Sequence, residues 1–128
     1  MSPIADMFTQ ISNAIAVNKK TVSLPFSKMK YNILKVMEEE GFIEKVIVKR
    51  GKKKKLVVKL KYFNTNSPAL HKIKLISKPS RHIYLNSQEL YFPKRGHGIL
   101  ILSTSKGIIT SKKAKKEKIG GEVICEIW

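Results

Sequence analysis

The 128-residue chain has a single cysteine, little negative charge and no long apolar segment. One cysteine, Cys125, excludes an intrachain disulfide and is typical of a protein from a reducing compartment. No apolar run approaches the roughly 20 residues that a membrane-spanning helix needs, and none has the form of a signal peptide. We therefore expect a cytoplasmic protein with no membrane contact.

Acidic residues are scarce relative to basic ones. Nine Asp and Glu stand against 26 Lys and Arg, which gives a formal net charge of +17. The excess is spread over both halves, because residues 1–66 carry 14 basic and 5 acidic side chains and residues 67–128 carry 12 and 4. A composition that is 42% hydrophobic can fill a core, so the chain is expected to fold. A polyanionic partner follows, most simply a nucleic acid.

The residues that a catalyst or a metal centre requires are scattered. His71, His82 and His97 have no cysteine or carboxylate at ligand spacing, and Cys125 lies in an apolar segment where a buried, inert thiol is expected. The chain lacks a Gly-x-Ser-x-Gly nucleophile motif and a phosphate-binding loop. We predict no metal, no cofactor, no small-molecule substrate and no enzymatic activity. A serine hydrolase assisted by histidine stays open as an alternative.

The first half of the chain predicts a helix, a strand, a second helix and a hairpin. Ser2 and Pro3 begin the first helix, which ends before Asn18, and Ser27 begins the second, which ends at Gly41. The second helix is expected to place its apolar residues on one face, namely Met29, Ile33, Val36 and Met37. The strands are expected at residues 21–24, 43–49 and 56–62, with a hairpin loop at 50–55.

The second half predicts a mostly antiparallel sheet with one short helix. A polar, turn-prone segment at 64–68 places the domain boundary between residues 66 and 67. Residues 72–76 and 81–85 alternate with a period of two around Pro79 and are expected to pair with each other. Further strands fit 98–102 and 122–128, and Ser111 caps a helix that ends before Gly120. The fold class is α+β in two small domains, the first αβαββ and the second mostly antiparallel sheet.

Three consecutive hydroxyl residues, Ser103, Thr104 and Ser105, follow an apolar strand and precede Lys106 and Gly107. Hydroxyls donate to and accept from base edges and ribose hydroxyls, while lysines attract phosphates. Gly107 permits a close backbone approach. The alternative is a turn whose hydroxyls bond their own backbone. The residues alone leave both interpretations open.

Other basic and aromatic residues also allow two interpretations, either an RNA contact or an ordinary structural role. Lys28 and Lys30 occupy the first turn of the second helix, where the helix dipole disfavours cations but exposed N–H groups suit a phosphate. They are either phosphate contacts or solvated lysines. Lys52 to Lys55 form a solvated turn or add to the positive field. Tyr84 either stacks on an unpaired base or packs half-buried on the sheet.

The segment from Gly98 to Thr110 reads Gly-Ile-Leu-Ile-Leu-Ser-Thr-Ser-Lys-Gly-Ile-Ile-Thr, which closely resembles the signature of the bacterial ribosomal small-subunit protein S-eight family. The resemblance extends over nearly the whole chain. Five more segments stand in the order and approximate spacing of that family: Pro3 to Met7, Glu39 to Ile43, Leu60 to Tyr62, Ile83 to Tyr84, and Gly120 to Cys125.

The resemblance implies a two-domain, non-enzymatic protein that binds a helix in the central domain of small-subunit rRNA and helps to assemble the platform. Neighbouring small-subunit ribosomal proteins are implied as partners, and some members also repress their own mRNA. The ribosome in question is cytoplasmic or organellar. The implied RNA-binding loop is Ser103, Thr104 and Ser105. The other candidates for RNA contact are Gly107, Tyr84, Arg81, Lys112, Gly121 and Glu122, with Lys28 and Lys30 on phosphates.

The chain departs from the family pattern at two places. Gln10 and Ser12 stand where the first helix usually carries basic residues, and Ser80, Arg81 and His82 replace a segment that more often contains glycine and arginine. The main alternative from another functional class is a nonspecific nucleic-acid compaction protein. Specific binding that survives excess duplex competitor separates the two functions.

Overall fold

The computed structural model describes residues 2–65 and 67–128, and the chain divides into two compact units, Met1–His71 and Lys72–Trp128. The described residues form three α-helices and antiparallel sheets, which confirms the α+β class. The predicted domain boundary lies earlier, between residues 66 and 67, and residue 66 is outside the described residues. Each unit is described by itself below.

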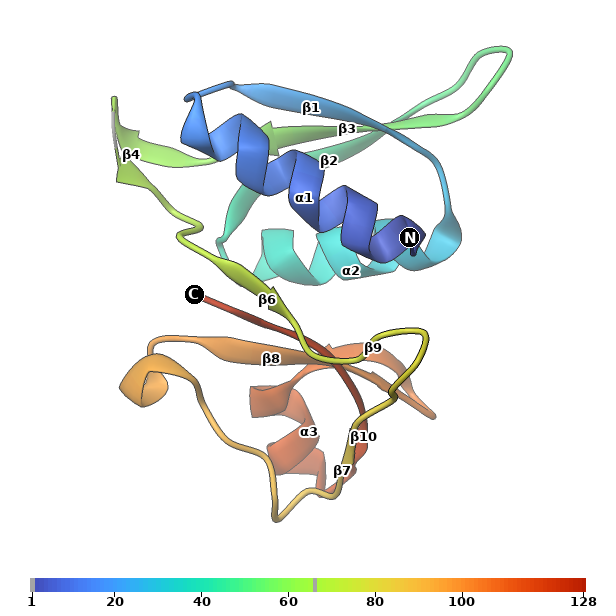
Figure 1. Cartoon of the computed structure of the whole chain (residues 1–128), viewed down its shortest axis with the longest axis vertical. Coiled ribbons are helices and arrows are strands. Elements are labelled where there is room, and N and C mark those ends of the chain that lie inside the picture. The colour runs from blue at the N-terminus through green and yellow to red at the C-terminus, as the bar shows by residue number, and fades with distance from the viewer. Residues whose placement is uncertain (1, 66) are drawn as a thin grey trace. The chain divides into compact units, whose positions relative to one another are not determined.

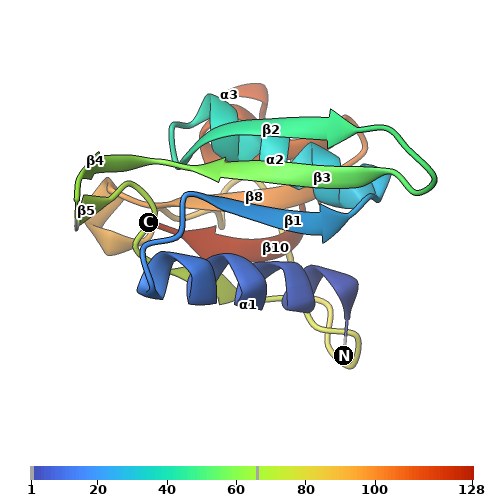
Figure 2. The same cartoon turned by 90° about the horizontal axis from the view of Figure 1, so that it is seen from above.

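The first unit is a three-stranded antiparallel sheet covered on one face by two helices, α1 (Pro3–Ala16) and α2 (Lys28–Glu39), as Figure 1 shows. Its strands are β1 (Thr21–Pro25), β2 (Ile43–Lys49) and β3 (Lys55–Leu60), in the order β1-β3-β2. Figure 2, the view from above, shows β3 between its two neighbours. Alternate residues of β3, Leu56, Val58 and Leu60, are buried, as expected for a sheet with one covered face.

The helix ends follow the sequence signals. The Ser2 hydroxyl accepts a hydrogen bond from the Ala5 N–H at 3.0 Å, and the Ser27 hydroxyl accepts one from the Lys30 N–H at 3.1 Å. At the other ends, Asn18 and Gly41 adopt the left-handed conformation that stops a helix, with φ of 58° and 81°. The predicted boundaries of both helices are confirmed.

Two local predictions in this unit are wrong. Met29 does not share the buried face of α2, because it is 45% exposed whereas Lys30 is 8% exposed. The buried stripe runs through Lys30, Ile33, Leu34 and Met37, and a residue one position earlier points about 100° away. The predicted strand 56–62 is also broken after Leu60, and β4 (Tyr62–Asn64) pairs instead with β5 (Ser67–Pro68).

The second unit is built around β10 (Gly121–Ile127), which pairs with three other strands. These partners are β6 (Ile73–Leu75), β7 (Tyr84–Leu85) and β8 (Ile99–Thr104), and β9 (Gly107–Thr110) lies outside β8. The helix α3 (Ser111–Glu117) contacts β8 and β9, and a 3₁₀ turn spans Lys94–Gly96. The core of this unit comprises Leu90, Leu100, Leu102, Ile109, Ala114 and Val123.

The expected pairing of 72–76 with 81–85 is wrong. Both segments do contain strands, but β6 and β7 each pair with β10, at opposite ends of it. Only a single bridge between Lys78 and Arg81 closes the turn at Pro79. Alternation identifies a strand but not its partner, and the longer β10 offers pairing positions to both short segments.

The start of α3 also differs by one residue from the prediction. Thr110 is the N-cap, and its hydroxyl accepts from the Lys113 N–H at 3.2 Å. Ser111 is buried, and its hydroxyl accepts from the Leu100 N–H at 3.1 Å, which fixes the helix to β8. The strand β9 was not predicted from the sequence, because its apolar pair is short and adjoins the hydroxyl residues.

Candidate nucleic-acid interface

The hydroxyl-rich segment is a tight hairpin. Strand β8 continues through Ser103 and Thr104, residues Ser105 and Lys106 make the turn, and β9 begins at Gly107. Gly107 has a φ of +100°, a conformation that side chains other than glycine's rarely adopt. A turn followed by a glycine with positive φ matches the twist of an antiparallel pair. The segment is therefore a rigid loop that presents Ser105 and Lys106 to solvent.

The three hydroxyls have different roles. The Thr104 Oγ1 donates to the Gly107 carbonyl at 2.9 Å and accepts from the Lys106 N–H at 3.1 Å, so it stabilises the turn itself. The local alternative is thus correct for Thr104. Within residues 2–65 and 67–128, the hydroxyls of Ser103 and Ser105 make no hydrogen bond. Those two hydroxyls are free to bind a ligand.

Lys106 at the tip of the turn is held by α3. Its Nζ lies 2.9 Å from Oε1 of Glu117, near the end of the helix. The hydrogen bond from Lys106 lowers the pKa of the Glu117 carboxyl. Because both side chains are at the surface, the pair adds little to stability. Its effect is to restrict where the turn and its cation point.

Three candidate residues form one row across the sheet, which we call the Tyr84–Glu122–Ser103 row. Glu122 on β10 is the register partner of Tyr84 on β7 and of Ser103 on β8. Residues that oppose one another in an antiparallel pair project from the same face, with Cβ atoms about 5 Å apart. The sheet thus brings together an aromatic ring, a carboxylate and a free hydroxyl from three segments of the chain.

Tyr84 is 68% exposed, so it is not the half-buried packing residue of the alternative interpretation. An exposed tyrosine ring on a sheet is a platform on which a nucleic-acid base can stack. The ring and the Ser103 hydroxyl flank Glu122 on either side. The row therefore combines a stacking surface with hydrogen-bonding groups.

Gly121 allows β10 to approach the turn. A Cβ on Gly121 would collide with the Ser103 carbonyl oxygen and the Thr104 Cγ2, and one on Gly120 would collide with the Leu85 carbonyl oxygen. Gly121 is therefore needed because a residue without a side chain lets the two backbones pack this closely. Gly121 contributes to the candidate site by letting β10 lie close to Ser103.

Glu122 has a partner that the sequence did not indicate. The Nδ1 of His82 lies 2.5 Å from Oε2 of Glu122. His82 stands in the segment that departs from the family pattern, and this was the one sequence signal that could have drawn attention to it. Arg81, the residue before it, is exposed in the turn closed by the bridge to Lys78. Lys112 is exposed on α3.

The remaining candidates, Lys28 and Lys30, belong to the first unit. Lys28 is exposed at the first turn of α2, whereas Lys30 is buried along most of its length. The lysine-rich hairpin loop lies against the residues that precede this helix: the Phe26 N–H donates to the Lys54 carbonyl at 3.2 Å, and the Lys54 Nζ lies 5.2 Å from the Phe26 ring centroid. Positive charge therefore gathers at this end of the first unit, around Lys28 rather than Lys30.

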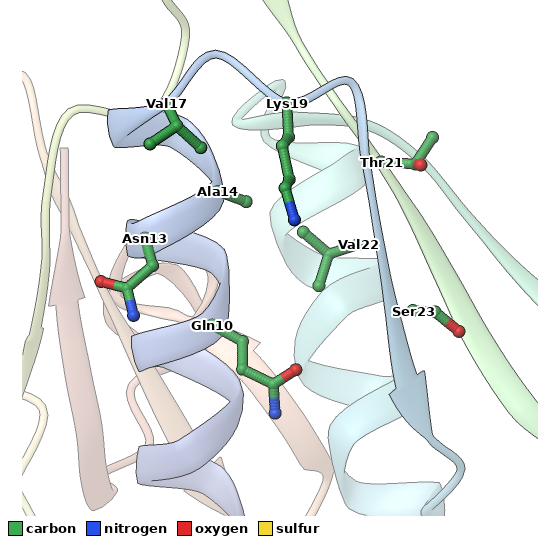
Figure 3. Close-up of a pocket in the computed structure, with 8 residues that line it drawn as sticks. All are labelled: Gln10, Asn13, Ala14, Val17, Lys19, Thr21, Val22 and Ser23. Carbon is green, nitrogen blue, oxygen red and sulfur yellow. The ribbon is translucent and has the colours of Figure 1, made fainter.

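One pocket of the first unit lies apart from these residues. Figure 3 shows it between α1 and β1, with Gln10 and Lys19 pointing toward the space between the two elements. It has a volume of about 430 Å³ and a single charged residue, Lys19, in its lining. None of the predicted site residues lines it. With one lysine in its lining, the pocket provides no array of positive charges for an anion.

The described residues offer no metal centre, no membrane-spanning helix and no reactive thiol. No group of three or more His, Cys, Asp and Glu is placed to hold a metal ion. No helix there has the length and apolarity to cross a membrane. Cys125 is buried, and burial raises the pKa of its thiol, which makes it unreactive.

Comparison with known proteins decides the family. A family model described as ribosomal protein S8 matches residues 2–128. The chain belongs to the ribosomal protein S8 family. It is similar to proteins called small ribosomal subunit protein uS8: it is 47% identical to that of Kosmotoga olearia, over 98% of this chain and 97% of the relative. It is 46% identical to that of Caldicellulosiruptor bescii, over 100% and 98%, and 42% identical to that of Sulfurihydrogenibium sp., over 98% and 97%.

Membership of the S8 family fixes the broad function. The chain is a structural protein of the small ribosomal subunit, where it resides, and it is not an enzyme. This excludes the serine-hydrolase alternative. It also gives small-subunit rRNA and ribosomal proteins as its class of partners.

Proposed function

We propose that this chain binds the central domain of small-subunit rRNA directly and thereby helps to assemble the platform of the subunit. The Tyr84–Glu122–Ser103 row and the adjoining Ser105 form the proposed contact surface. The observation that carries the proposal is the geometry of this row, in which an exposed ring and the free Ser103 hydroxyl lie beside the turn that presents the free Ser105 hydroxyl. Unpaired bases in an irregular RNA helix are the ligand that this combination suits.

Affinity and selectivity have separate sources in this proposal. The net charge of +17 attracts any RNA by displacing counterions from its phosphates. Lys28 and the lysines of the hairpin loop contribute to this attraction in the first unit, and Lys112 and Arg81 do so in the second. The hydroxyls and the Tyr84 ring select the RNA, because hydrogen bonds and stacking depend on where unpaired bases lie.

The negative charge of Glu122 in the middle of the row argues against the compaction alternative. A surface that only condenses nucleic acid gains nothing from a carboxylate at its centre, since the charge repels phosphates. A carboxylate oxygen does accept hydrogen bonds from a ribose 2′-hydroxyl or a base amino group. The row is therefore better suited to reading a particular RNA surface than to neutralising charge.

The same surface would bind a hairpin in the chain's own mRNA if that hairpin reproduced the irregular features of the rRNA site. We include such translational repression in the proposal, together with contacts to neighbouring small-subunit proteins. Competition between the mRNA leader and the rRNA fragment for one site on the protein tests the repression. Independent binding of both RNAs at once would contradict it.

The proposal is tested by titrating the protein with a labelled central-domain rRNA fragment in the presence of excess unrelated duplex RNA. We expect the fragment to stay bound, because specific sites are typically at least a thousandfold tighter than nonspecific ones. Loss of binding in proportion to the competitor would support the compaction protein instead. A hydroxyl-radical footprint on whole small-subunit rRNA should show protection confined to the central domain.

A further inference from the structure

His82 in the second unit contacts Glu122, and the proposed function assigns no role to this contact. Its Nδ1 lies 2.5 Å from Oε2 of Glu122, and the two side chains are 54% and 23% exposed. The pair joins the loop before β7 to the middle of the Tyr84–Glu122–Ser103 row. His82 thus lies at the edge of the proposed RNA surface.

The backbone holds His82 in this place. Ile83, the next residue, donates its N–H to the Ser77 hydroxyl at 3.0 Å and accepts at its carbonyl from the Val123 N–H at 2.8 Å. These two bonds fix residue 83 between the turn and β10. His82 is therefore positioned beside Glu122 by its neighbours and does not reach it by chance from a mobile loop.

The contact controls two properties of Glu122. It occupies Oε2 and so directs Oε1 to any ligand on the surface. It also sets the local charge: with His82 protonated the pair is neutral, and with His82 neutral the row carries the full carboxylate charge. Histidine is the side chain that ordinarily changes its charge between about pH 5 and pH 8.

We propose that His82 is a positioning residue that orients Glu122 and neutralises it, so that this chain binds its RNA more tightly when His82 is protonated. The inference rests on the proposed function, because it concerns the same surface. It adds a pH dependence and a positioning residue that lies in the segment where this chain departs from the family pattern. A permanent cation at this position would neutralise Glu122 at every pH, whereas histidine makes the neutralisation conditional.

The other charged and titratable groups on the elements around the pair are not histidines. They are Lys78 and Arg81 in the turn, Tyr84 on β7, and Lys106 with its partner Glu117. Lysine, arginine and tyrosine ordinarily titrate near pH 10 or above, and glutamate near pH 4. Histidine is the side chain that ordinarily changes charge between about pH 5 and pH 8, so the experiment varies the pH within that range.

The experiment measures the Kd of the full chain for the central-domain rRNA fragment from pH 5.5 to pH 8.0 at constant salt. We expect wild-type affinity to fall by about three- to fivefold as the pH rises, the size of one surface charge interaction. The His82→Arg variant should bind at every pH as wild type does at pH 5.5. The His82→Gln variant, which keeps a hydrogen bond but no charge, should bind throughout as wild type does at pH 8.0.

Two further variants locate the effect. Glu122→Gln removes the carboxylate and should weaken the pH dependence, because the proton on His82 then no longer neutralises a carboxylate, whereas His97→Gln removes an exposed histidine elsewhere in the same unit and should leave the pH dependence intact. An unchanged pH profile in His82→Gln, with specific binding retained, would overturn this inference alone. Failure of the wild-type chain to hold the fragment against duplex competitor would overturn the proposed function, and this inference with it.

Discussion

Ser103 of β8 lies directly opposite Glu122 of β10, and both side chains project from the same face of the sheet. The same strand places Glu122 opposite Tyr84 on its other side. Pairing across β10 thus assembles a surface from residues that lie far apart in the sequence.

The first prediction concerns the close approach of β10 to β8. Gly121→Ala should lower the free energy of unfolding by about 1–3 kcal/mol, because the new methyl group collides with the Ser103 carbonyl oxygen and forces the strands apart. Urea denaturation measures the loss. Gly51→Ala is the control: a Cβ there meets nothing within 4 Å, so stability should stay within about 0.5 kcal/mol of wild type. Equal effects of both substitutions would contradict the packing argument.

The second prediction concerns stacking. Tyr84→Ala should weaken binding of the rRNA fragment by about 1–3 kcal/mol, since an aromatic platform under one base is lost. Stability should change little, because Tyr84 is 68% exposed. Tyr84→Phe keeps the ring and should bind nearly as wild type does. If Tyr84→Phe binds as weakly as Tyr84→Ala, the hydroxyl rather than the ring makes the contact.

The third prediction separates charge from selectivity. Lys28→Ala should reduce the slope of log Kobs against log salt by about one, because one phosphate contact is removed. Met29→Ala changes the exposed neighbour without changing charge and should leave the slope as it is. A slope that is equally steep in Lys28→Ala and wild type would remove Lys28 from the contact surface.

The fourth prediction is a pH dependence of stability in the first unit. The Val46 N–H donates to Oε1 of Glu38 at 2.8 Å and Lys35 contacts Oε2 at 3.1 Å, so the pKa of Glu38 is lowered, chiefly by the Val46 hydrogen bond. A carboxyl whose pKa is lower in the folded state stabilises the fold above its unfolded-state pKa, and this contribution is lost as the pH falls through the folded value. Glu38→Gln should therefore lose less stability than wild type between pH 7 and pH 3.

At pH 7 the same substitution should cost about 1.5 kcal/mol, the value for a hydrogen bond to a charged group at the lower end of its range. Glu39→Gln serves as the control, because Glu39 is exposed on the same helix. Denaturant titrations at the two pH values give all the quantities needed. Parallel losses in Glu38→Gln and wild type would show that the carboxylate does not link α2 to β2.

Much of the local structure could be predicted because it depends on neighbours in the chain. Ser2 and Ser27 cap their helices by bonds that span three residues, and Asn18 and Gly41 end them by their own backbone preference. Strand partners are different. The alternation in 72–76 and 81–85 could not show that both segments meet β10, because pairing is decided by the burial of distant residues.

The candidate loop illustrates the same limit. Sequence could identify Ser103, Thr104 and Ser105 as a group but could not separate them, since each carries a hydroxyl. Their separation depends on the hairpin register, which turns the Thr104 hydroxyl toward the Gly107 carbonyl and leaves its two neighbours free. The contact between His82 and Glu122 joins residues that are distant in sequence, so it appears only once the sheet is formed.

The most direct test of rRNA selection by the free hydroxyls is the affinity of Ser103→Ala and Ser105→Ala for two RNAs over a range of salt. We expect each variant to lose about 1–3 kcal/mol on the central-domain rRNA fragment, with the salt slope and the affinity for unrelated duplex RNA unchanged. Equal losses on both RNAs would contradict the claim, because the hydroxyls would then contribute to general RNA affinity and not to the choice of RNA.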